Sequence, residues 1–204
     1  MKKWLVALFM FVSLPALAAG LREGVDYKLL PVPQPVSQKD KVEVIEFFSY
    51  GCVHCFNLEP SVVTWQKKLP ADVAFRQEQI VWDKNMEPLV RLFASIRISG
   101  QSSKLHEPAF SAVVKEKRNF AQPEAVKAWV KAQGGDVDKF MQIYQSFSVI
   151  NSEVARATKM TRSYQIEATP SFVIAGKYMP LAAEPQRLLQ VVDALIAKAR
   201  EERK

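Results

Sequence analysis

The sequence has little cysteine, glycine and histidine. Only 2 of its 204 residues are Cys, 7 are Gly and 2 are His. So few cysteines exclude a small scaffold stapled by several disulfides, and so little glycine excludes a collagen-like repeat. With 49% hydrophobic and 24% charged residues, the composition also excludes a disordered chain. We therefore expect one or two folded domains, each stabilised by an ordinary hydrophobic core.

The sequence also lacks a hydrophobic run long enough to cross a membrane. The apolar run from Trp4 to Leu14 is shorter than the roughly 20 residues of a spanning helix, which argues against a membrane anchor. It follows Lys2 and Lys3 and precedes a small-residue site that ends at Ala18. This pattern predicts a secretory signal peptide at residues 1–18. Its removal would lower the net charge from +7 to +5, because two lysines are lost, and would leave a soluble exported protein.

Hydrophobic periodicity predicts two strands and a helix in the first part of the chain. Residues 42–48 are β-branched and aromatic at most positions, which is typical of a buried strand. Apolar residues then recur at helical spacing to about Lys68, and residues 73–82 again have the composition of a strand.

The pattern is helical from about residue 83 to residue 165. One helix in this stretch is predicted to begin at Asp136 and to carry Phe140, Tyr144 and Phe147 on its apolar face. The strand pattern returns at residues 171–174 and 177–179, before a last helix. We predict a β/α domain formed by residues 19–82 and 166–204, split by an all-helical insert at residues 83–165.

The two cysteines stand together as Cys52-Val53-His54-Cys55, where the first strand passes into a helix. A thiol at the start of a helix faces unpaired backbone N–H groups and the positive end of the helix dipole, which favour the thiolate. We predict that Cys52 is the nucleophile, that cationic His54 favours its thiolate further, and that Cys55 is less accessible and attacks a mixed disulfide formed at Cys52. A stabilised thiolate makes the corresponding disulfide easy to donate, so the pair is predicted to oxidise the thiols of other proteins.

Three features together resemble the DsbA family of periplasmic thiol:disulfide oxidoreductases. They are the Cys-Val-His-Cys motif after Glu46-Phe47-Phe48-Ser49, the Thr169-Pro170 pair before a strand, and the helical region between them. The resemblance implies an α/β thioredoxin fold with an inserted all-helical domain. It also implies disulfide donation to unfolded or reduced exported proteins in the periplasm, and reoxidation by a DsbB-type membrane protein that passes electrons to quinone. We expect a monomer with no cofactor beyond the redox-active Cys52–Cys55 disulfide, and no metal.

The resemblance extends to individual positions around the cysteines. Glu46 is similar to the buried acid of the family, which would exchange a proton with Cys55. The alternative for Glu46 is a solvated position on an edge strand, and nearby Glu43 is expected to be solvated.

Two further positions concern the substrate and the redox potential. Thr169-Pro170 resembles the cis-proline segment that offers its backbone to an extended substrate. Val53 stands where many members of the family have Pro, so Val53, like Glu46, is expected to modulate the cysteines. The redox potential is expected to depend on Val53 and Thr169, the two departures from the pattern of many members. Pro60 matches a helix-kinking proline found in many thioredoxin folds, and its alternative is a helix of only two turns.

Other functions fit the sequence less well. A reductase or isomerase on the same fold is the first alternative, although little chain precedes the first main strand to form a separate dimerisation domain. A peptide-binding holdase would need only apolar residues beside the cysteines. Metal capture would have to use distant His106, which we expect to be a surface or boundary residue. The basic balance does not predict a nucleic-acid partner, because Lys115, Lys117 and Arg118 alternate with Glu116 near a helix end.

Overall fold

A five-stranded mixed sheet forms the centre of one half of the molecule. The computed structural model describes residues 20–181 and 184–203, so the predicted signal peptide at residues 1–18 lies outside the described residues. The strand order is β1-β5-β4-β2-β3, and β2 is parallel to β3 but antiparallel to β4. The strands are β1 (Tyr27–Leu29), β2 (Val42–Phe48), β3 (Val73–Gln79), β4 (Ser171–Ile174) and β5 (Tyr178–Pro180).

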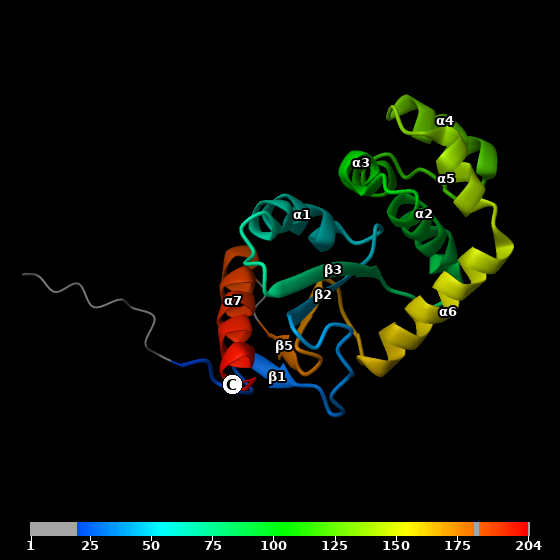
Figure 1. Ribbon diagram of the computed structural model, residues 1–204. Coiled ribbons are helices and arrows are strands. Elements are labelled where there is room, and N and C mark those ends of the chain that lie inside the picture. Colours follow the sequence, from blue (N-terminus) through cyan, green and yellow to red (C-terminus); the bar gives the residue numbers. More distant parts are fainter. Residues whose placement is uncertain (1–19, 182–183, 204) are drawn as a thin grey trace, which may run out of the picture.

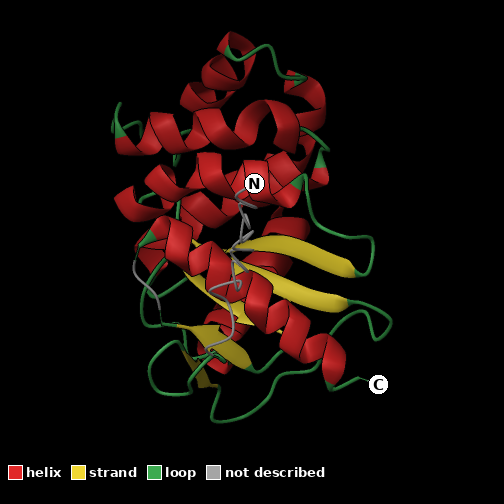
Figure 2. Ribbon diagram, turned by 90° about the vertical axis from the view of Figure 1, so that its left-hand side faces the viewer, coloured by secondary structure: helices red, strands yellow, loops and turns green. Residues whose placement is uncertain are grey.

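The helices between β3 and β4 form a separate group beside the sheet, as Figure 1 shows. The helices are α1 (Val53–Gln66), α2 (Glu87–Ile98), α3 (Ser102–Val114), α4 (Pro123–Ala132), α5 (Val137–Tyr144), α6 (Phe147–Ser163) and α7 (Pro185–Glu201). A short 3₁₀ turn, Lys84–Met86, leads into α2. Figure 2 shows α7 lying across the sheet while the inserted helices gather at one end of the molecule. The α/β fold with an all-helical insert is therefore confirmed.

Strand β2 is an interior strand that is covered on both faces. Val42 and Val44 pack in one cluster with residues of α1 and α7, whereas Ile45 and Phe47 pack on the opposite face against Tyr164 at the end of α6. Side chains alternate between the faces of a strand, so two covered faces require a continuous apolar run. This is why all seven residues of β2 are buried.

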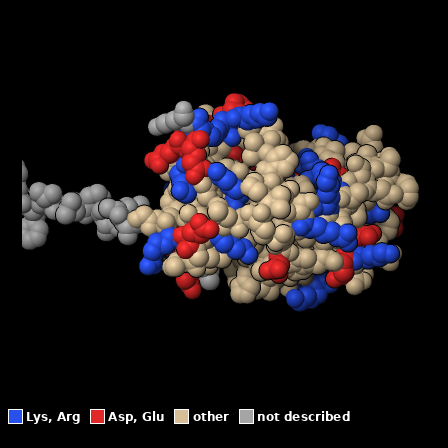
Figure 3. All heavy atoms as spheres, turned by 90° about the horizontal axis from the view of Figure 1, so that it is seen from below, with Lys and Arg blue, Asp and Glu red and all other residues tan. Residues whose placement is uncertain are grey.

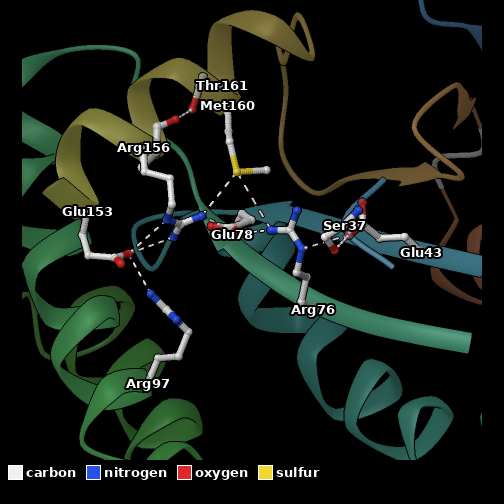
Figure 4. Close-up of polar contacts among 10 residues, drawn as sticks. Ser37, Glu43, Arg76, Glu78, Arg97, Glu153, Arg156, Met160 and Thr161 are labelled. Carbon is white, nitrogen blue, oxygen red and sulfur yellow. Dashed lines mark hydrogen bonds and ion pairs between the residues drawn. The ribbon is translucent and has the colours of Figure 1, made fainter. Parts of the chain in front are cut away.

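The burial of Glu43 contradicts the prediction that it is solvated. Glu43 is buried on the same face as Ile45, where Ser37 donates to its carboxylate and Arg76 Nε lies 3.6 Å from Oε2. Figure 4 shows Arg76 between Glu43 and Glu78. The face of β2 that carries Glu43, Ile45 and Phe47 is covered, and Arg76 lies beside it. The Glu43 carboxylate is therefore paired with a cation inside the fold instead of facing water.

Two predicted element boundaries were wrong. Strand β3 ends at Gln79 instead of Trp82, because its partner β2 ends at Phe48 and the Val81 N–H donates to the Thr161 hydroxyl of α6 at 3.0 Å. Phe147 does not share a helix with Phe140, because α5 ends at Tyr144. The backbone of Ser146 is extended, and a new helix, α6, begins at Phe147. The Phe147 side chain is 77% exposed.

The loop after β2 is anchored in the core of the insert. Phe48 and Tyr50 pack edge to face with ring centroids 5.1 Å apart, and both contact Phe93 and Phe110 of the inserted helices. Such aromatic contacts hold both the end of β2 and the start of α1 against the insert. The insert therefore fixes the segment that carries the cysteines.

The outer surface carries charges of both signs. Figure 3 shows basic and acidic side chains interspersed on one face of the molecule. Within residues 20–181 and 184–203, no helix combines the length and apolar character needed to cross a bilayer.

Candidate functional site

Cys52 is the N-cap residue of α1. Its backbone is extended, with φ of −88° and ψ of 116°, and its Sγ accepts a hydrogen bond from the Cys55 N–H at 3.1 Å. An N-cap side chain occupies the position where free N–H groups point outward. The sulfur of Cys52 therefore takes the place of the oxygen that usually caps a helix, and the predicted strand-to-helix junction is confirmed.

The two cysteines have opposite proton affinities. Both are free in this structure, with Cys52 partly exposed and Cys55 buried. The pKa of Cys52 is lowered to about 5, chiefly by the hydrogen bond with the Cys55 thiol and further by Thr169 and the N–H groups of Cys55 and His54, although burial opposes the shift. Burial, followed by the hydrogen bond with Cys52, raises the pKa of Cys55 strongly. The pair can therefore hold one thiolate and one thiol at neutral pH.

The Thr169–Pro170 segment lies against the Cys52 sulfur. The peptide bond between Thr169 and Pro170 is cis, and the Thr169 carbonyl oxygen lies 3.4 Å from Cys52 Sγ. A cleft of about 530 Å³ runs beside this contact. Its lining residues are His54, Asn57, Leu58, Thr169, Pro170, Glu184, Pro185 and Leu188.

The two residues between the cysteines lie on the outer side of α1. Val53 is the first residue of the helix and is half exposed, while the exposed His54 lines the cleft. Helix α1 continues through Pro60 for 14 residues, so the alternative of a two-turn helix is wrong. His54 and Thr169 thus line the cleft, and Cys52 lies against Thr169 at its edge.

Glu46 lies inside the fold beneath α1. It is 1% exposed on interior strand β2, so the alternative of a solvated edge position is wrong. Gln77, its register partner on β3, donates to Oε2 at 2.9 Å, whereas Oε1 has no hydrogen-bond partner. Burial, the charge of Glu59 and the charge of Cys52 raise the pKa of Glu46 to about 8, against the lowering effect of Gln77. Its carboxyl can therefore take up or release a proton near neutral pH, within the electrostatic field of the cysteines.

Sequence reasoning missed a second buried carboxylate, Glu59. It lies four residues after Cys55 on α1, is 2% exposed, and accepts a hydrogen bond from Gln77 at 2.9 Å. Cys55, Leu58, Glu59 and Val62 are all buried on α1, so a carboxylate among them at helical spacing was the available signal.

The prediction of a surface or boundary position for His106 was wrong. His106 is 8% exposed on α3, packed among Phe48, Tyr50, Phe93 and Phe110. The Tyr50 hydroxyl lies 2.7 Å from His106 Nδ1, and Nε2 lies 3.3 Å from Glu59 Oε1 without hydrogen-bond alignment. His106 is buried because α3 packs against α1, a contact that the sequence pattern does not reveal.

The arrangement suits thiol chemistry at Cys52. The described part of the chain contains no group of three or more His, Cys, Asp or Glu side chains placed to hold a metal ion. A low-pKa thiolate beside a cleft and a buried thiol behind it are the parts of a thiol–disulfide exchange site, and a buried carboxyl with a raised pKa lies beneath them.

Comparison with known proteins places this site in a defined family. Residues 43–195 match the model of the DSBA-like thioredoxin domain. The thiol:disulfide interchange protein DsbA of Azotobacter vinelandii is 37% identical over 185 residues, covering 89% of this chain and 86% of that protein. The protein of the same name from Pseudomonas aeruginosa is 35% identical over 202 residues, covering 96% and 95% of the two chains. The solved structure of the oxidoreductase NmDsbA1 from N. meningitidis superposes with a TM-score of 0.82 at 34% identity, covering 90% of this chain and 96% of that one.

Proposed function

Because the chain belongs to the DsbA-like thioredoxin family and is a thiol:disulfide oxidoreductase, we propose that it acts as a disulfide donor. Its substrates are unfolded or reduced exported proteins, which receive the Cys52–Cys55 disulfide. The redox-active disulfide is the only redox group the reaction needs.

The observation that carries this proposal is the opposed pKa of the two sulfurs. The pKa of Cys52 falls to about 5 while that of Cys55 is raised. A thiolate stabilised in the reduced protein is a good leaving group, so the oxidised form gives up its disulfide readily. Because the reduced form of the protein is stabilised, donation of its disulfide to a substrate is favoured over reduction of a substrate disulfide.

The reaction proceeds in two exchanges. A substrate thiolate attacks Cys52 Sγ, the Cys52–Cys55 bond breaks, and the Cys55 thiolate takes up a proton from Glu46. A second substrate thiolate then attacks the substrate sulfur of the mixed disulfide, and Cys52 leaves as a thiolate. The substrate dithiol loses two electrons, and the protein disulfide gains them.

The residues around the cleft have distinct proposed roles in these exchanges. The exposed His54 imidazole lies where a positive charge favours the outgoing Cys52 thiolate. The Thr169-Pro170 segment, 3.4 Å from Cys52 Sγ, offers its backbone to the extended substrate chain. Val53, as the first residue of α1, and Thr169, whose carbonyl lies against Cys52 Sγ, modulate the redox potential.

Family membership supports the wider setting that we propose. We place the mature protein in the periplasm after removal of residues 1–18, as a monomer. The sheet domain comprises residues 19–82 and 166–204, and the helical insert residues 83–165. A DsbB-type membrane oxidase linked to quinone restores the disulfide. Nucleic acid has no part in this function, in keeping with the interspersed surface charges (Figure 3).

Equilibration with glutathione tests the assignment directly. The reduced and oxidised fractions are measured in glutathione buffers of known ratio, and we expect a potential more oxidising than that of the glutathione couple. A reducing potential would favour the alternative of a reductase.

A substitution separates catalysis from peptide binding. Cys52→Ala is expected to abolish oxidation of a reduced, unfolded test protein, because the attacked sulfur is gone. Ser103→Ala, on an exposed position of α3, serves as the control and should retain full activity. If Cys52→Ala still promoted disulfide formation, the proposal would be rejected, and retained protection from aggregation alone would indicate a holdase.

A further inference from the structure

Two buried ionisable side chains have no part in the exchanges described so far. Glu59 lies on α1 and His106 on α3, the helix of the insert that packs against α1. Gln77 Nε2 is 2.9 Å from both Glu46 Oε2 and Glu59 Oε2, so one amide nitrogen holds the two carboxylates close together. His106 Nε2 lies 3.3 Å from Glu59 Oε1 on the far side of that carboxylate. A continuous polar path therefore runs from Glu46 to an imidazole of the insert.

This path ends at an open cavity. Glu59, Gln77 and His106 line a cavity of about 520 Å³ whose rim includes the exposed Lys67 and Ser103. Glu46 is not among its lining residues and is 1% exposed. The cavity thus brings Glu59 and His106, which are 2% and 8% exposed, next to solvent, whereas Glu46 lies beneath α1 and does not line it.

The proposed reaction requires Glu46, which is buried beneath α1, to gain and lose a proton in every cycle. Cys55 must gain a proton when the disulfide is donated and lose one when it is restored, and Glu46 is the carrier. A buried carrier that is used in every cycle must exchange its proton with solvent. Imidazole is the side chain that most readily gains and loses protons near neutral pH.

We propose that His106, acting through Glu59, is the positioning residue that connects Glu46 with solvent for proton exchange. This inference rests on the proposed function and extends it to the helical insert. The Tyr50 hydroxyl, 2.7 Å from Nδ1, can donate to that nitrogen and so place the imidazole proton on Nε2, the ring nitrogen 3.3 Å from Glu59 Oε1. The insert thereby contributes one member of the proton path that serves the cysteines.

The charged groups around Glu59 come from every element that packs against it. Arg76 of β3 pairs with Glu43 and Glu78, and Arg97 of α2 pairs with Glu153 at 2.7 Å. Lys67 of α1 lies at the rim of the cavity. Among the residues described, His106 is the basic side chain that lies within ion-pair distance of Glu59. Its side chain therefore acts on Glu59 at ion-pair range, which none of Arg76, Arg97 and Lys67 reaches in the described part of the chain.

The test follows the step in which Cys55 loses its proton. The reduced protein is mixed with glutathione disulfide, so that the Cys52 thiolate forms a mixed disulfide and releases one glutathione. Cys55 then gives its proton to Glu46 and attacks Cys52 Sγ, which releases the second glutathione. Acid quenching and mass spectrometry measure how long the glutathione adduct at Cys52 persists.

In His106→Ala the adduct should persist about 10-fold longer at neutral pH, because proton exit through Glu59 is slowed. Imidazole added to the buffer should restore the decay by entering the cavity, while sodium chloride at equal ionic strength should not. His106→Gln, which keeps a polar side chain but cannot carry a proton, should show the same delay. Ser103→Ala, which changes the same cavity without touching the path, should decay like the unmodified protein.

Unchanged adduct decay in both His106 variants would overturn the inference. A delay in His106→Ala that imidazole leaves unaltered would assign His106 a packing role and would also overturn it. Failure of the proposed function looks different, because the unmodified protein itself would then fail to oxidise a reduced test protein. Unfolding of each variant in urea confirms that the delay is measured on folded protein.

Discussion

At the scale of single residues, position gives two identical side chains different chemistry. Cys52 caps α1 at the edge of a cleft, where N–H groups and the Cys55 thiol stabilise its thiolate. Cys55 lies one turn further on and is buried, which disfavours its thiolate. The same contrast applies to carboxylates, since Glu43 has a cationic partner and Glu46 has a neutral amide. Burial alone therefore does not set the protonation state of an ionisable group, because the charged and hydrogen-bonding groups around it also shift its pKa.

The low pKa of Cys52 should make the stability of the reduced protein depend on pH. The pKa is about 5 in the folded state and 9.0 for an unperturbed thiol, so the folded state prefers the thiolate. The resulting stabilisation is fully present above pH 9.0 and is lost as the pH falls through about 5. At pH 7 the unscreened value would be about 3 kcal/mol, and because Cys52 is partly exposed and solvent screens its charge, roughly 1–2 kcal/mol of unfolding free energy should remain.

Urea unfolding of the reduced protein across this pH range measures the effect. Cys52→Ser serves as the control, because a hydroxyl does not ionise there and this contribution should be absent. Parallel stability curves for the reduced protein and Cys52→Ser between pH 5 and pH 9 would show that Cys52 is not a stabilised thiolate.

At the scale of elements, the first turn of α1 has the geometry that the exchange site needs. Cys52 is extended and Val53 opens the helix, so the sulfur stands at the end of the helix while Cys55 enters the core. Register partners on β2 and β3 place Glu46 beside Gln77 under the same helix. The strands β2 and β3 and the helix α1 thereby bring the Cys52 thiolate, the Cys55 thiol and the Glu46 carboxyl close together.

Val53→Pro should be tolerated at this junction. Proline fits the first position of a helix, and the residue before it prefers the extended backbone that Cys52 already has, with ψ of 116°. The unfolding free energy should stay equal or rise by up to about 1 kcal/mol, because proline restricts the unfolded chain. Urea unfolding checks this, with Val53→Ala as the matched variant. A loss of more than about 2 kcal/mol relative to Val53→Ala would mean that the first turn is strained by proline.

At the scale of the whole molecule, the insert and the sheet domain share a boundary at the site. The insert has its own core, in which Trp129 packs edge to face on Phe120 with ring centroids 5.0 Å apart. Phe48 and Tyr50 belong to that core although they come from β2 and the loop after it. A second link is ionic, because Arg156 of α6 donates to Glu78 of β3 at 2.7 Å, as Figure 4 shows. Both links couple the insert to the sheet.

We therefore expect one cooperative unfolding transition, and a core substitution in the insert should destabilise the whole chain. Trp129→Ala should cost about 3–5 kcal/mol, because a large buried side chain is removed. Phe147→Ala removes an aromatic ring that is 77% exposed and should cost less than about 0.5 kcal/mol. Denaturation followed by circular dichroism and by tryptophan fluorescence tests both expectations. Separate transitions in the two signals would show that the insert unfolds by itself.

Local patterns in the sequence were sufficient for much of the fold and for the centre of the site. The bounds of β2 agree with the predicted 42–48, and the strand-to-helix junction at the cysteines was correctly placed. These features depend on β-branched runs, helical periodicity and the Cys-Val-His-Cys motif, all of which lie within a few residues along the chain. The end of β3 was not predictable in this way, because it is set by the length of its partner strand.

By itself, the sequence determined where the reactive sulfurs lie, what they can do, and that a carboxylate lies mid-strand beneath them. Only the tertiary structure decided that Glu43 is buried, that Glu59 shares Gln77 with Glu46, and that His106 reaches Glu59 from the insert. The physical reason is that burial and pairing of polar groups depend on what covers each face of an element. Those covering residues come from segments far apart in the chain, whose meeting no local pattern encodes.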